Sequence, residues 1–321
     1  MSRVGRRRSR ILGLILRAGL ALGLLGLAIQ MNRREIQGVL DRKPDVLGFA
    51  WGLAFYLSGL MFAYLRWYML VRALGLSFRY PDAVRLGFIG ALFNFVIPGA
   101  VFGNVVKAAF LCRERPEDKP KAIGSVLVDF LSGLLGLFLI AALVGTIGRD
   151  QLNPGVRNLV LAAWLLVVVA GLALIVAFRP RRNGRRAGAG AYRGRMAVIP
   201  LAVVMGMGTH ALNVLSFYSV AGALFGRDIP SPAEHFLIVP LVIFTTAVPL
   251  PFGALGVSEQ ASRGLFGLMN YSGGAVAMLG FRLMMLAGAA IGAGVYMFNQ
   301  KEVRALVAET DSVPSPLVGE G

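Results

Sequence analysis

Long stretches without charged residues constrain the fold of this 321-residue chain most strongly. Five windows contain no Asp, Glu, Lys or Arg, and they cover residues 46–65, 86–106, 158–178, 196–226 and 236–258. Two further apolar windows hold one charge each, Asp129 and Arg282. A helix needs about 20 consecutive apolar residues to cross the hydrocarbon core of a bilayer. The chain is therefore predicted to be an all-α polytopic membrane protein.

The composition agrees with a membrane environment. Apolar residues make up 56% of the chain and charged residues 15%, and the mean hydropathy is +0.69. A soluble domain has about 45–50% apolar and about 25% charged residues. We expect about six spanning helices in one membrane domain at 11–300, a basic tail at 1–10 and a flexible tail at 301–321.

Two of the uncharged windows are broken in the middle by proline and glycine. The breaks contain Pro98, Gly99 and Gly103 in the first window, and Pro249, Pro251, Gly253 and Gly256 in the second. Broken backbone persists at membrane depth only where protein buries it or where it lines a cavity. A matched pair of such segments points to a transport site. We predict two re-entrant hairpins, at about 86–106 and about 237–256.

The excess of positive charge, +17 overall, indicates the orientation. Lys and Arg in short loops mark the cytoplasmic side. They gather at 1–10, in the loop 179–195 with seven Arg, and on both flanks of the first hairpin. This pattern places both termini in the cytoplasm and makes the hairpins enter from opposite faces. Such an arrangement is an inverted-topology repeat around a midplane site.

The candidate substrate-binding residues are polar side chains near the breaks and inside the spans. They are Asn94, Asn104, Lys107, Asp129, Glu259 and Arg282. Charges near the bilayer centre are costly and usually face a cavity or a partner. Asp129 follows Ala122 by seven residues, about 10 Å along a helix, which is too deep for a short side chain to snorkel.

The other charges also have structural explanations. Lys107 fits an interfacial cation of the cytoplasmic side. Glu259 fits a first-turn acid favoured by the helix dipole, paired with Arg263 one turn later. Arg282 is near enough to the end of its span to snorkel outward.

Four segments in the same order resemble the membrane region of the lysylphosphatidylglycerol synthase family, which is related to the flippase domain of the multiple peptide resistance factor. They are Arg66-Trp67 with the basic loop after it, Asn94 with Pro98-Gly99 and Gly103 to Lys107, Val128-Asp129 with Gly133 to Gly136, and Pro251 to Glu259. The resemblance covers about 11–298. It implies a flippase-like domain in a bacterial-type plasma (inner) membrane, without the soluble aminoacyl-transferase domain of complete members.

The chain departs from the family pattern at several charges. The family usually has Asp where this chain has Asn104, Arg where it has Lys107, and Arg where it has Phe130 and Ser258. A lysine lacks the planar fork with which arginine grips phosphate. These departures put the identity of the substrate in question.

The predicted function is lipid translocation, in which a phospholipid or lipid-linked headgroup crosses through a cleft between the hairpins. Helix N-termini at Asn104 and Ser258 would offer N–H groups to its phosphate. The alternatives are an accessory subunit of an envelope-lipid or glycolipid enzyme, a carrier of a small solute, and a membrane-embedded transferase. The sequence holds no Asp-rich metal cluster or nucleotide loop for the last of these. The expected partners are a membrane lipid and, for an accessory subunit, a lipid-modifying enzyme; nucleic acid, catalytic residues, metals and cofactors are not expected.

Overall fold

Helices dominate the computed structural model, which describes residues 45–97, 102–178, 192, 194–247 and 254–298, with scattered residues between 23 and 41. Five helices are long and apolar enough to cross a membrane. They are α3 (Val46–Ala73), α6 (Lys119–Ile147), α7 (Arg157–Ala177), α8 (Val198–Phe225) and α12 (Gly274–Phe298). The expected first span lies mostly outside the described residues. The prediction of an all-α polytopic membrane protein is confirmed.

Four shorter helices form two pairs around the proline-glycine breaks. The first pair is α4 (Tyr80–Val96) and α5 (Phe102–Glu114), and the second is α9 (Pro232–Thr245) and α11 (Val257–Gly267). With 11 to 17 residues each, all four are shorter than the roughly 20 residues of a span. The helices of each pair pack against each other and extend beyond the 86–106 and 237–256 segments. The predicted tip residues Pro98, Gly99, Pro249, Pro251 and Gly253 lie outside the described residues.

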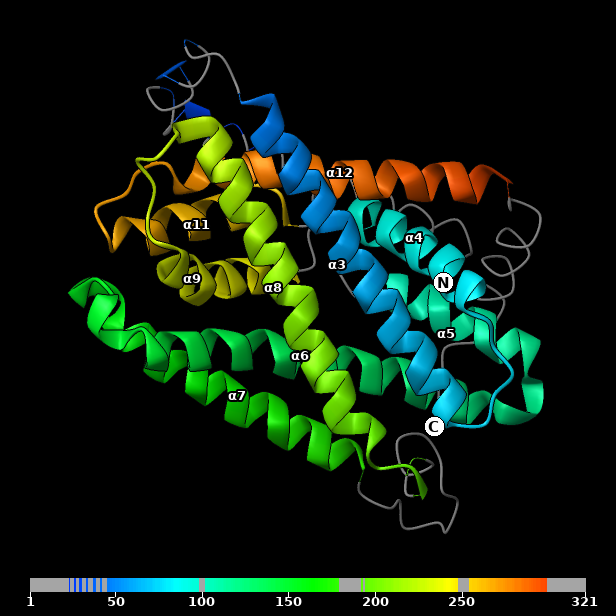
Figure 1. Ribbon diagram of the computed structural model, residues 1–321. Helices are drawn as coiled ribbons and strands as arrows, with labels where there is room; N and C mark the ends of the chain where they lie inside the picture. Colours follow the sequence, from blue (N-terminus) through cyan, green and yellow to red (C-terminus); the bar gives the residue numbers. More distant parts are fainter. Residues whose placement is uncertain are drawn as a thin grey trace, which may run out of the picture.

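The packing partners of the first half recur in the second half. Helix α6 follows the pair α4/α5 and packs against α5, just as α12 follows α9/α11 and packs against α11. The first helix of each pair also packs on the other half, because α4 contacts α12 and α9 contacts α6. In Figure 1, α12 lies above and α6 below, the two pairs lie between them at right and left, and α3 and α8 run side by side across the front.

The first pair has its outer ends at the basic end of the molecule. There Arg195 Nη1 donates to the carbonyls of Arg72 and Ala73, at 3.2 and 3.3 Å. These two residues are the last of α3. The Arg115 side chain, after α5, donates to the Ser77 hydroxyl, before α4. The start of α4 and the end of α5 therefore lie together with the basic loops.

The second pair has its outer ends at the opposite end of the molecule. The Asn153 N–H, in the connection between α6 and α7, donates to Glu234 Oε1 in the first turn of α9, at 3.3 Å. Beyond α11, Tyr271 stacks edge-on against Phe225 at the end of α8, with ring centroids 5.9 Å apart. The two helix pairs thus approach the middle of the molecule from opposite ends.

Glycines allow the two spans of the centre to cross closely. A Cβ atom on Gly136 of α6 would lie 2.7 Å from the Gly206 carbonyl carbon and the Met207 nitrogen of α8. Small residues at helix crossings let the backbones approach and increase van der Waals contact, which helps to drive helix association in lipid. This close crossing fixes the position of α6, the helix that carries Asp129.

Candidate functional site

A buried cluster of three charges joins α3, α5 and α6. Arg66 Nε donates to Asp129 Oδ1 at 2.8 Å, and Lys107 Nζ lies 3.6 Å from Asp129 Oδ2. The exposed fractions are 6% for Arg66, 9% for Lys107 and 3% for Asp129. Lys107 Nζ also lies 4.9 Å from the ring centroid of Trp67, a cation–π contact. The structure therefore brings together two of the predicted residues, Lys107 and Asp129, and adds Arg66.

Two glycines make room for the Arg66 guanidinium. A Cβ atom on Gly133 would lie 2.8 Å from both Nη1 and Nη2, and one on Gly206 would lie 3.1 Å from Nη1. Nη1 has no hydrogen-bond partner among the described residues. The first cluster, Arg66, Lys107 and Asp129, thus holds two cations for one carboxylate in a site from which water is largely excluded.

A second buried cluster joins α11 and α12. Arg282 Nε and Nη2 lie 2.7 and 2.6 Å from Glu259 Oε1. Glu259 Oε2 accepts the N–H of Gly256 at 2.6 Å, which caps the first turn of α11. Gly256 has a φ of +88°, a conformation that favours glycine. The second cluster, Glu259 and Arg282, therefore contains one carboxylate and one cation that pairs with it.

This pairing corrects one of the structural explanations and supports another. Arg282 is only 7% exposed and is bound to Glu259, so the expectation that it snorkels outward is wrong. Arg282 is thus a partner of Glu259, and the pairing of Glu259 with Arg263 stays a prediction. The first-turn position of Glu259 is confirmed, because the carboxylate does cap its helix.

The two clusters occupy corresponding positions in the two halves. In each, a charge on the helix that leaves a broken segment pairs with a charge on the following span. Arg282 follows Glu259 by 23 residues, and Asp129 follows Lys107 at nearly the same spacing. The polarity is reversed, because the cation lies on α5 in the first half and on α12 in the second.

A narrow cavity of about 180 Å³ lies between the inner ends of α4 and α9. It is lined by residues from α3, α4, α12 and the end of α9, namely Tyr56, Leu60, Ala91, Asn94, Phe95, Thr246 and Met285. Pockets for drug-sized ligands measure about 300–1,000 Å³. This central cavity is therefore of a size for a small polar group, not for a whole lipid.

Asn94 connects the central cavity to the start of α5. Its Oδ1 accepts the N–H of Gly103 at 2.7 Å. Asn104, half-buried in the first turn of α5, follows directly. At the corresponding place in the second half the Gly256 N–H is bound by Glu259. Two N–H groups at the predicted phosphate-binding helix ends are thus already bound by side chains.

An apolar groove of about 510 Å³ adjoins the central cavity. Phe95 lines both spaces. The groove is otherwise lined mainly by aliphatic and aromatic residues from α3, α8 and α12, and Arg282 is the one charged residue among the described residues that line it. The central cavity, with its few polar groups, and the apolar groove therefore meet at Phe95.

Sequence reasoning missed the part played by several residues. Arg66 follows the uncharged window 46–65 directly and resembled an interfacial residue, but α3 continues to Ala73 and places it inside the protein. Thr246 and Tyr56 carry no charge, and only the packing of the helices brings them to the central cavity. The place of Arg66 in the family-like segment Arg66-Trp67 was the sequence signal that could have found it.

The comparisons with known proteins agree with this architecture. A search of curated proteins gave no match. A family model described as the lysylphosphatidylglycerol synthase TM region matches residues 14–292. That match includes every described spanning helix up to the last two turns of α12 and both charge clusters. The chain therefore belongs to the lysylphosphatidylglycerol synthase transmembrane-region family.

Proposed function

We propose that this multi-pass membrane protein translocates a phospholipid or lipid-linked headgroup between the two leaflets. The family gives the chain a role that concerns membrane lipids. The observation that carries the proposal is the contact at Phe95 between the apolar groove and the smaller central cavity, to which Tyr56, Asn94 and Thr246 bring polar groups. A lipid likewise joins a small part with polar groups, the headgroup, to larger apolar chains. A soluble solute would have no use for the groove.

The charge balance favours a headgroup that contains phosphate. The first cluster carries one cation more than its carboxylate neutralises, and a guanidinium or ammonium binds phosphate through charge-assisted hydrogen bonds. In the proposed mechanism α4/α5 and α9/α11 are re-entrant hairpins whose inner ends bound the central cavity. Rocking of one half against the other would open the cavity to each leaflet in turn.

Filling the central cavity tests this mechanism. Ala91 lines the cavity, and Ala91→Phe would occupy the space that a headgroup needs. Ala54→Phe, on the exposed face of α3, is the matched control. Purified protein in liposomes is given a fluorescent phospholipid, and the fraction protected from a quencher is followed with time. We expect Ala91→Phe to abolish translocation and Ala54→Phe to leave it unchanged.

Alanine replacement of the predicted charges tests the site assignment. Lys107→Ala, Asp129→Ala and Glu259→Ala are compared in the same liposomes, with Lys121→Ala at the basic surface as the control. Normal translocation in all three variants would remove these residues from the site. Wild-type protein that is folded but moves no lipid unaided would contradict translocation and favour an accessory role.

A further inference from the structure

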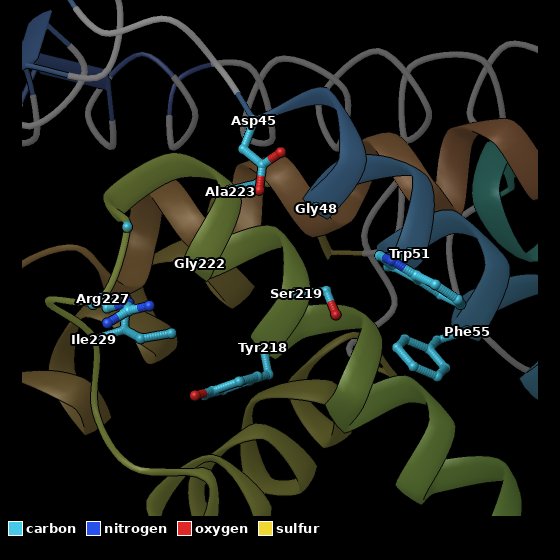
Figure 2. A pocket seen from close by; sticks show the side chains of 11 residues that line it. Asp45, Gly48, Trp51, Phe55, Tyr218, Ser219, Gly222, Ala223, Arg227 and Ile229 are labelled. Carbon is cyan, nitrogen blue, oxygen red and sulfur yellow. The ribbon is translucent and has the colours of Figure 1, made fainter.

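A second, larger cavity lies at the end of the molecule away from the basic loops. Its volume is about 790 Å³, and it is formed between the start of α3 and the end of α8. Figure 2 shows the side chains around it. Among the residues that the structure describes, it shares no lining residue with the central cavity or with the apolar groove. It is therefore a separate site that the translocation mechanism does not use.

One side of this outer pocket is polar. Arg227 follows the end of α8 and is exposed, and Asp45 precedes α3. Asp45 Oδ1 accepts the N–H of Leu47 at 3.0 Å and caps the helix. Within the part of the chain that the structure describes, neither charge forms an ion pair. Both signs of charge are thus presented to the same pocket without neutralising each other.

The other side of the outer pocket is aromatic. Trp51 and Phe55 stack on the same face of α3, with ring centroids 5.9 Å apart, and Trp51 is 56% exposed. Figure 2 shows these rings across the pocket from Arg227, while the Tyr218 hydroxyl is directed to the side of Arg227. Tyr218 is held edge-on against the His235 ring, with centroids 5.0 Å apart. Tryptophan and tyrosine favour the boundary between headgroups and acyl chains.

We propose that the outer pocket binds a zwitterionic aminophospholipid from the leaflet at this end of the protein. Arg227 would bind the phosphodiester, because guanidinium forms paired hydrogen bonds with phosphate oxygens. Asp45 would bind the ammonium group. Trp51 and Phe55 would contact the glycerol and the first methylenes of the acyl chains. We infer an intact lipid as the ligand because of the exposed rings. A free headgroup without acyl chains would make no contact with them.

Photochemical labelling tests the site without any transport step. The purified full chain in nanodiscs is labelled with a phosphatidylethanolamine that carries a diazirine close to its glycerol, and the labelled peptides are mapped by mass spectrometry. We expect label at the start of α3 and the end of α8. Arg227→Ala should reduce it about tenfold, as expected for loss of a charge-assisted hydrogen bond. Arg149→Ala, an exposed arginine at the same end, should have no effect.

Asp45→Asn tests the headgroup preference. Asparagine caps helices as well as aspartate does, so the fold is retained while the charge is removed. Wild-type labelling should be competed several-fold better by phosphatidylethanolamine than by phosphatidylglycerol, and Asp45→Asn should abolish that difference. An unchanged preference, equal losses in Arg227→Ala and Arg149→Ala, or equal competition by soluble glycerophosphoethanolamine would overturn the proposal. Because labelling measures binding at equilibrium, its result does not depend on whether the protein translocates lipid.

Discussion

The two buried charge clusters occupy equivalent places in the two halves of the molecule but differ in polarity and in balance. In the second cluster Glu259 uses one oxygen for Arg282 and the other for the Gly256 N–H. In the first, Asp129 serves both Arg66 and Lys107. A charge inside the membrane costs at least about 2.5–3.5 kcal/mol. The second cluster therefore has the form of a structural tie between α11 and α12, whereas the excess cation of the first needs a functional reason.

Removing the carboxylate of the first cluster should have the largest effect. Asp129→Asn leaves Arg66 and Lys107 buried side by side without a counter-charge. Breaking one buried pair costs about 3–5 kcal/mol, and here two cations lose their partner at once. We expect the free energy of unfolding, measured by SDS titration in mixed micelles, to fall by at least that amount. Asp118→Asn, which breaks the half-exposed pair with Lys121, should cost less than about 1 kcal/mol. Equal losses would refute the comparison.

Breaking the second cluster should rank next. Glu259→Gln keeps an oxygen for the Gly256 N–H but leaves one buried cation, Arg282, without its carboxylate. We expect a loss of about 3 kcal/mol in the same titration. The double variant Glu259→Gln with Arg282→Gln removes both charges and should recover part of that loss. A double variant less stable than either single variant would show that the pair does not act as a charge-balanced unit.

Displacing Arg66 without changing a charge should have an intermediate effect. A methyl group from Gly133→Ala would meet the guanidinium at 2.8 Å and push it from Asp129. Overpacking of this kind costs about 1–3 kcal/mol. Gly171→Ala on α7, where a Cβ atom meets nothing within 4 Å, is the control and should be neutral or slightly stabilising. If both variants behave alike, the close fit around Arg66 has no energetic consequence.

The spans were predictable from sequence because bilayer thickness sets their length. The window 158–178 matches α7 to within one residue at each end, since its ends coincide with polar loops. The expected ends of the first hairpin were less accurate. The segment 86–106 ends where charged residues begin, but α4 begins at Tyr80 and α5 continues to Glu114, because helices at a membrane surface extend past the apolar core.

Residues of the candidate site were predictable from the sequence only where they carry a charge. Lys107, Asp129, Glu259 and Arg282 were found because charges are rare inside spans, and the structure pairs all four. Their pairing followed from the crossing of helices, which a single sequence does not contain. Arg66 was not predicted as a site residue for the same reason, since its position beside Asp129 depends on glycines of two other helices, Gly133 and Gly206.

Replacing Lys107 is the clearest test of the difference between the two clusters, although it should have the smallest effect on the free energy of unfolding. Lys107→Met keeps the length of the side chain and leaves Arg66 and Asp129 as a balanced pair, as in the second cluster. We expect the free energy of unfolding to change by less than about 1 kcal/mol, since no buried charge loses its only partner. Translocation of a fluorescent phospholipid in liposomes should nevertheless fall about tenfold, the effect of one lost charge-assisted hydrogen bond to phosphate. Lys107→Arg, which keeps the charge, should retain most of the activity. A Lys107→Met protein as unstable as Asp129→Asn would make the first cluster structural like the second, because its excess cation would then be needed for folding instead of for the lipid.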